Sequence, residues 1–65
     1  MNNNVRQLRE ARGMTQKDLS LQVGVSRQAI NAIETGKYDP SIRLAFALAK
    51  FFSKPVEELF QEERS

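Results

Sequence analysis

The segment from Val25 to Gly36 contains side chains that can hydrogen-bond to the edges of DNA bases. At about 100° per residue, a helix over this segment gathers polar or small side chains within an arc of roughly 140°. These side chains are Arg27, Gln28, Asn31, Ala32 and Thr35. Arginine can pair with guanine and glutamine or asparagine with adenine, while alanine permits contact with a thymine methyl group. A merely solvated helix face more often carries Glu and Lys, so this arc favours a major-groove contact.

A second helix is expected immediately upstream of this segment. Thr15 is a good N-cap, and Asp18 stands three residues later in place of the usual Glu of a capping box. Gly24 ends this helix, because glycine adopts the left-handed conformation at little cost, and Ser26 caps the next helix. Two helices joined by so short a turn cross steeply, which predicts a helix-turn-helix at about residues 15–35.

The run from Met14 to Ser41 resembles the Cro/repressor (XRE-type) DNA-binding family. The resemblance lies in Thr15-Gln16, Leu19, Val23-Gly24-Val25-Ser26, Ile30, Ile33-Glu34 and Gly36-Lys37. It extends over nearly the whole chain and implies a compact, all-α, five-helix Cro/repressor-like (lambda-repressor-like) domain over residues 1–65. Ser20, Thr35 and Pro55 stand where the family more often has Ala, Asn and Ser or Thr, respectively.

The remaining helices are expected at about Asn4–Arg12, Ile42–Phe52 and Pro55–Gln61, with Ala11 on the inward side of the first. Ser41 caps the second of these, and residues 61–65 are expected to form a frayed tail. The expected core consists of apolar residues from all five helices: Val5, Leu8, Leu19, Val23, Val25, Ile30, Ile33, Ile42, Ala45, Leu48, Ala49, Val56 and Leu59.

Glu34 falls on the inward side of its helix beside Ile30, where a carboxylate needs a cationic partner. Arg9 is the expected partner, and the family resemblance also implies an Arg9–Glu34 ion pair with a structural role. Contact of Arg9 with a phosphate is the alternative.

Contacts with DNA divide into base readers and phosphate binders. The predicted base readers are Ser26, Arg27, Gln28, Asn31 and Ala32. The predicted phosphate contacts are Gln16, which the resemblance implies, and Lys17, Thr35, Lys37, Tyr38 and Arg43. Lys37 could instead be ordinary surface charge, and Tyr38 could cover the edge of the core.

Composition excludes most enzyme chemistry. The 65 residues contain neither Cys nor His, so disulfides, thiol nucleophiles, imidazole bases and the usual zinc ligands are absent. The net charge is +2, with a balance of +3 in residues 1–37 and −1 in residues 38–65. We expect no catalysis, metal, cofactor or small-molecule ligand. With no apolar run long enough to span a membrane and no signal peptide, a cytoplasmic protein is expected.

A single small domain gives limited affinity for DNA, so a homodimer on double-stranded DNA is the expected state. Four aromatics, Phe46, Phe51, Phe52 and Phe60, are more than one small core needs, and Phe51, Phe52 and Phe60 are the main candidates for a twofold interface. The alternative places all four in the core.

The sequence therefore predicts a transcriptional regulator, a repressor that occupies a palindromic operator with its third helix in the major groove. An antitoxin or a restriction-modification controller of the same fold would differ in genomic neighbourhood rather than in sequence. A protein-interaction module that has lost DNA binding is a further alternative, which the set Gln16, Arg27, Gln28 and Asn31 argues against.

Overall fold

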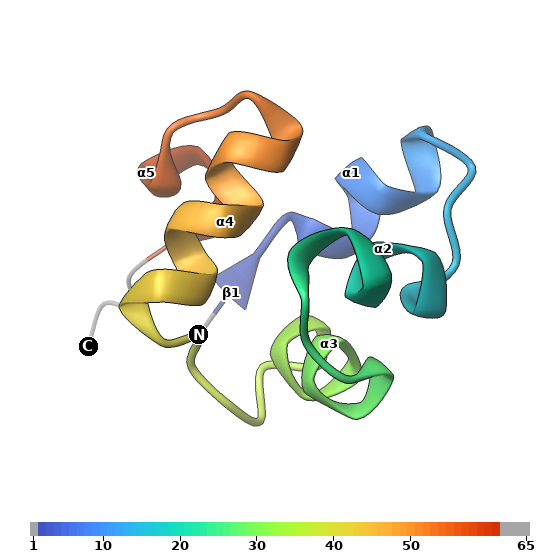
Figure 1. The fold of residues 1–65 in the computed structure, drawn as a ribbon. Coiled ribbons are helices and arrows are strands. Elements are labelled where there is room, and N and C mark those ends of the chain that lie inside the picture. The colour runs from blue at the N-terminus through green and yellow to red at the C-terminus, as the bar shows by residue number, and fades with distance from the viewer. Residues whose placement is uncertain (1, 62–65) are drawn as a thin grey trace.

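Five helices and one short strand pair make up residues 2–61, the part of the chain described in the computed structural model. The order is β1 (Asn2–Asn3), α1 (Val5–Ala11), α2 (Gln16–Val23), α3 (Arg27–Glu34), α4 (Ile42–Phe52), α5 (Val56–Leu59) and β2 (Phe60–Gln61). Figure 1 shows α4 and α5 on one side of the molecule and α1, α2 and α3 on the other. The predicted all-α fold with its helix-turn-helix is confirmed.

Side-chain caps begin the three central helices where the sequence places them. Thr15 accepts a hydrogen bond from the Asp18 backbone N–H at 3.0 Å, and the Asp18 carboxylate accepts one from the Thr15 N–H at 2.9 Å. Ser26 and Ser41 likewise accept from the backbone N–H groups three residues later. These bonds satisfy N–H groups that a helix leaves unpaired at its start.

Gly24 makes the turn between α2 and α3. Its φ of 75° is left-handed, and its N–H donates to the Ser20 carbonyl at 2.9 Å. Glycine adopts this conformation without the steric cost that a Cβ would impose. The turn therefore ends α2 and redirects the chain into α3.

The core lies where all five helices meet. Its buried apolar residues are Val5, Leu19, Ile30, Ile33, Leu44, Ala45, Leu48, Phe52, Leu59 and Phe60. Two expected inward positions are wrong: Ala11 is exposed, and Ile42 is 74% exposed. Because α4 buries Leu44, Leu48 and Phe52 at four-residue spacing, the side chain two positions before Leu44 turns away from the core.

The last helix is shorter than predicted. It ends at Leu59, and the next two residues form β2, which pairs antiparallel with β1 in the register Asn2 with Gln61 and Asn3 with Phe60. Gln61 is therefore part of a strand and not of a frayed tail, while residues 62–65 lie outside the described residues. The pairing fastens the start of the chain to the end of α5, together with an Asn4 N–H bond to the Leu59 carbonyl at 2.9 Å.

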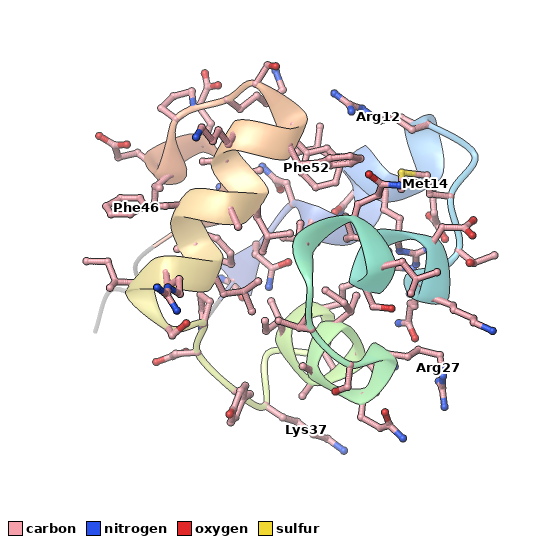
Figure 2. All side chains as sticks on the ribbon, in the orientation of Figure 1. Arg12, Met14, Arg27, Lys37, Phe46 and Phe52 are labelled. Carbon is pink, nitrogen blue, oxygen red and sulfur yellow. The ribbon has the colours of Figure 1, made fainter. Side chains whose placement is uncertain are left out.

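The aromatic residues require a correction to the expected dimer interface. Phe52 and Phe60 are 4% and 8% exposed, so both belong to the core of one chain. Phe51 is half-buried, and the Arg12 guanidinium lies 5.0 Å from its ring centroid and 5.1 Å from that of Phe52. Of the four phenylalanines, only Phe46 is largely exposed, at 60%, and Figure 2 shows it pointing away from the molecule.

Candidate nucleic-acid interface

Helix α3 separates its polar and apolar side chains as the sequence predicts. Ile30 and Ile33 are fully buried against the core, while Arg27, Gln28 and Asn31 are exposed. Figure 2 shows Arg27 and Lys37 projecting outward near opposite ends of this helix. The outer face of α3 is thus free to approach another molecule, whereas its inner face is fixed by packing.

The start of α3 exposes three neighbouring side chains that can form hydrogen bonds, Ser26, Arg27 and Gln28. The Ser26 hydroxyl caps the helix by accepting from the Ala29 N–H at 3.1 Å, so its own hydrogen stays free to donate. Ala32, one of the predicted base readers, is half-buried. It can offer only its methyl group to a base.

A buried ion pair ties α1 to the end of α3. Arg9 Nε lies 2.7 Å from Glu34 Oε2, and Arg9 Nη2 lies 3.1 Å from Glu34 Oε1. The remaining terminal nitrogen, Nη1, donates to the Met14 carbonyl at 2.7 Å. The side chains are 10% and 2% exposed, respectively, and the hydrogen bond to Glu34 raises the pKa of Arg9 above its ordinary value. These contacts place both residues in the role that the sequence predicted, and they leave Arg9 little freedom to reach a phosphate.

Gln16, the first residue of α2, connects this ion pair to the exposed face of α3. Its Nε2 donates to Glu34 Oε1 at 3.1 Å, and its Oε1 accepts from Asn31 Nδ2 at 3.4 Å. Sequence reasoning did not find either contact, because nothing in local spacing brings residues 16, 31 and 34 together. Gln16 has been predicted only as a phosphate contact, a role that its remaining N–H could still serve.

The side chains predicted to contact phosphates differ in whether they already make hydrogen bonds within the protein. Lys17, Lys37, Tyr38 and Arg43 are exposed, and within residues 2–61 the three cations make no ion pair. Thr35 differs, because its hydroxyl donates to the carbonyls of Asn31 at 3.0 Å and Ala32 at 3.2 Å. A hydroxyl has one hydrogen, and a phosphate oxygen needs a donor, so Thr35 is a poor phosphate ligand in this conformation.

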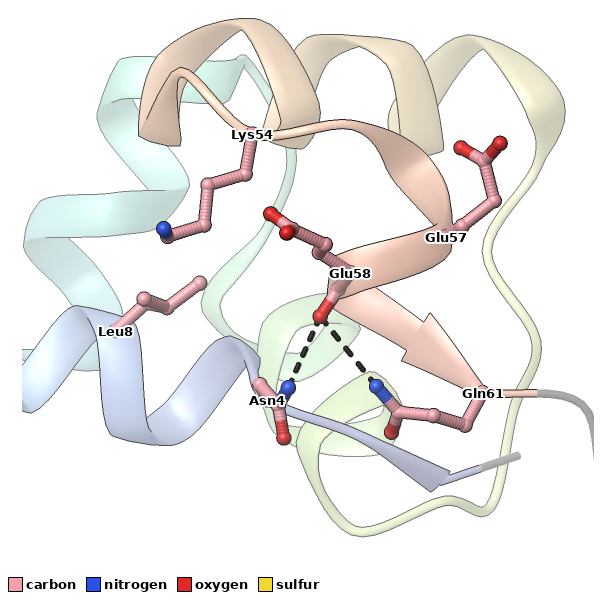
Figure 3. Close-up of a pocket in the computed structure, with 6 residues that line it drawn as sticks. All are labelled: Asn4, Leu8, Lys54, Glu57, Glu58 and Gln61. Atoms are coloured by element: carbon pink, nitrogen blue, oxygen red, sulfur yellow. Dashed lines mark hydrogen bonds between the residues drawn. The ribbon is translucent and has the colours of Figure 1, made fainter.

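A shallow pocket lies away from α3, between the start of α1 and α5. It is lined by Asn4, Leu8, Lys54, Glu57, Glu58 and Gln61 (Figure 3). The Glu58 carbonyl accepts from Asn4 Nδ2 at 2.9 Å and from Gln61 Nε2 at 3.4 Å. The Asn4 bond fastens the start of α1 to α5, and the Gln61 bond is local to the end of α5.

Within residues 2–61, no cluster of three or more His, Cys, Asp or Glu side chains is placed to hold a metal ion. None of the helices described for this chain has the length and apolar character needed to cross a membrane.

Comparison with known proteins also points to DNA binding. The family model described as helix-turn-helix matches residues 5–59. The chain belongs to this family. It is a small DNA-binding transcriptional regulator of the XRE type, a class that is not enzymatic.

Three relatives cover almost the whole helix-turn-helix chain. An uncharacterised HTH-type transcriptional regulator of Methanocaldococcus jannaschii is 52% identical over 92% of this chain and 91% of its own length. The transcriptional activator BcrR of Enterococcus faecalis is 39% identical over 95% of this chain and 30% of its own length. The transcriptional repressor RstR of the cryptic phage CTXphi of Vibrio cholerae is 30% identical over 94% of this chain and 55% of its own length.

Proposed function

We propose that this regulator represses transcription by binding a palindromic operator as a homodimer, with α3 of each copy in the major groove. The observation that carries the proposal is the outer face of α3, where Arg27, Gln28 and Asn31 are exposed opposite the buried Ile30 and Ile33. A helix fixed to a core along one side and bearing long hydrogen-bonding side chains on the other suits the groove.

Each exposed group takes one of two roles in the proposal. Base contacts come from Ser26, Arg27, Gln28, Asn31 and the Ala32 methyl group, because the first turns of α3 enter the groove deepest. Phosphate contacts come from Lys17, Lys37, Tyr38 and Arg43, together with the unpaired backbone N–H groups at the start of α2. The phosphate contacts set the position of the domain, and the base contacts set its sequence preference.

The dimer contact is proposed on the outer face of α4. Ile42 and Phe46, one turn apart, are 74% and 60% exposed and are among the largest exposed apolar side chains described. A twofold contact requires a self-complementary surface, and an exposed apolar patch meets this requirement because it can pack against its own copy. A second copy of the chain is therefore its proposed occupant.

Repression follows from occupancy alone, because a dimer seated on an operator that overlaps a promoter excludes polymerase. The relatives include both an activator and a phage repressor, so the proposed sign of regulation rests on this occupancy argument. In this proposal, protein concentration regulates the repressor, and no small molecule is bound. A cytoplasmic location is proposed as well, because the protein acts on DNA.

Salt dependence of binding tests the DNA contact. If each copy neutralises about three phosphates, log K against log salt falls with a slope of about −6 for the dimer, because each contact releases condensed counterions. The measurement is fluorescence anisotropy of a labelled operator selected from random oligonucleotides. A slope near zero would refute the proposal and leave a protein-interaction module as the alternative.

Single-base variants of the selected operator test the reading by α3. Arg27→Ala and Gln28→Ala should each cost about 1–3 kcal/mol and relax preference at one base pair per half-site. Lys37→Ala is the matched control and should weaken all sequences by the same factor. If the two α3 variants also weaken every sequence equally, specificity comes from DNA shape instead.

A further inference from the structure

A chain of hydrogen bonds runs from the buried interior to the outer face of α3. It begins at Glu34, whose side chain is 2% exposed, and passes through Gln16 to Asn31, whose side chain is exposed. With Arg9, which donates two hydrogen bonds to the Glu34 carboxylate, the chain has four members on three helices. The proposed base reader Asn31 is thus connected through Gln16 to the buried Arg9–Glu34 ion pair.

The chemistry of these groups permits only one orientation for each amide. An ionised carboxylate can only accept hydrogen bonds, so the Gln16 side chain must turn its NH₂ group toward Glu34. Its carbonyl oxygen then faces Asn31, and that oxygen can only accept. Asn31 must therefore turn its own NH₂ group toward Gln16.

The fixed orientation determines what Asn31 offers to DNA. One hydrogen of its Nδ2 is used by Gln16, and the second hydrogen and Oδ1 remain. These two groups lie on one edge of the amide when the hydrogen used by Gln16 is the one that points away from Oδ1. This donor and acceptor pair matches N7 and the N6 amino group of adenine in the major groove. The major-groove edge of guanine carries acceptors only, so Oδ1 would meet no donor there.

We propose that Gln16 is a positioning residue, held by Glu34, which fixes the side-chain amide of Asn31 to read adenine. The inference rests on the proposed function, since it assumes that α3 enters the major groove. Pre-set orientation favours recognition because less conformational freedom is lost on binding. Since the Gln16–Asn31 contact is exposed and 3.4 Å long, we expect a moderate effect rather than an absolute requirement.

The test compares Gln16→Met with its neighbour Lys17→Gln. The methionine keeps the length of the side chain and the Arg9–Glu34 pair but removes both amide contacts. The base pair under Asn31 is first located as the one at which Asn31→Ala reduces discrimination, and all four pairs are then placed there. We expect the parent to prefer adenine, and Gln16→Met to reduce that preference about threefold to tenfold. Lys17→Gln should weaken binding to all four sequences by one common factor.

Two further measurements separate positioning from a direct phosphate contact. In the Asn31→Ala background, Gln16→Met should cause no further loss of discrimination at this base pair, because the two residues act through one contact. In the free protein, the NMR signals of the Asn31 side-chain NH₂ group should show slowed hydrogen exchange that Gln16→Met abolishes. This second readout needs no DNA.

The results that overturn the inference are distinct from those that overturn the proposed function. Base-specific binding that Gln16→Met weakens uniformly, or an Asn31 NH₂ signal that the substitution leaves unchanged, would refute the positioning role alone. A preference for guanine or a pyrimidine at this position would refute the adenine reading. Uniform binding of all sequences by the parent protein would refute the proposed function and this inference together.

Discussion

Replacing Glu34 by alanine should destabilise the protein severely, because it leaves a cation in the interior. The carboxylate accepts two hydrogen bonds from Arg9, at 2.7 and 3.1 Å, and one from Gln16 at 3.1 Å. All three are lost in Glu34→Ala. Arg9, whose side chain is 10% exposed, keeps only its bond to the Met14 carbonyl.

The loss of stability in Glu34→Ala depends on how deeply Arg9 is buried and on which hydrogen-bond acceptors it can still reach. Removing one partner of a buried ion pair costs about 3–5 kcal/mol. Arg9 can recover part of this through the exposed Glu10, whose Oε2 is already 4.0 Å from Nη2. We therefore expect a loss of about 2–4 kcal/mol. At about 0.05–0.15 kcal/mol per residue, that is a large part of the total stability of so small a protein.

Urea denaturation followed by far-ultraviolet circular dichroism measures this loss. With an m value of about 1 kcal/mol per molar urea, the midpoint should fall by about 2–4 M. Glu58→Ala is the control, since Glu58 is exposed and should change stability by less than about 0.5 kcal/mol. The double substitution Arg9→Met with Glu34→Met should recover most of the loss, because an apolar pair leaves no unpaired charge. A Glu34→Ala midpoint equal to that of the parent would refute the assignment of a buried, stabilising pair.

Three further predictions test the fold and the dimer. Hydrogen bonds from Thr15 hold the pKa of the Asp18 carboxyl below its ordinary value. The stability that this cap contributes is therefore fully present above about pH 4 and is lost as the pH falls through the lowered pKa. The urea midpoints of the parent and Asp18→Asn should converge in acid. Phe46→Glu should convert the dimer to a monomer in analytical ultracentrifugation, with little loss of monomer stability. Phe52→Ala, in the core, should instead lower the free energy of unfolding by about 3–5 kcal/mol in urea denaturation. A Phe46→Glu protein that remains dimeric would place the interface elsewhere. Gly24→Ala should lower the free energy of unfolding by about 1–2 kcal/mol. The whole effect should come from backbone strain, since no atom lies within 4 Å of the added Cβ. An unchanged melting temperature in calorimetry would contradict the left-handed turn.

Signals that act within one or two helical turns could be predicted from the sequence. Thr15, Ser26 and Ser41 cap the helices that follow them, and Gly24 makes the turn. The amphipathic pattern also put Ile30 and Ile33 inside and Arg27 outside. Such features depend on contacts between residues that are near each other in the chain, so their type and spacing suffice.

Features that depend on how helices meet could not be predicted in this way. In the apolar run of α4, Ile42 and Leu44 are equally suited to a core, and only the packing of α4 against the other helices turns Leu44 inward. The β1–β2 pair joins residues at opposite ends of the described chain, and no local propensity indicates it.

The candidate site shows the same division. The sequence by itself determined that α3 has a polar outer face and that Glu34 needs a cationic partner, because periodicity and the cost of a buried charge are local properties. Only the tertiary structure decided that Gln16 lies between Glu34 and Asn31. That contact requires the crossing of α2 and α3 at one particular distance and angle, which is set by the side chains packed between them.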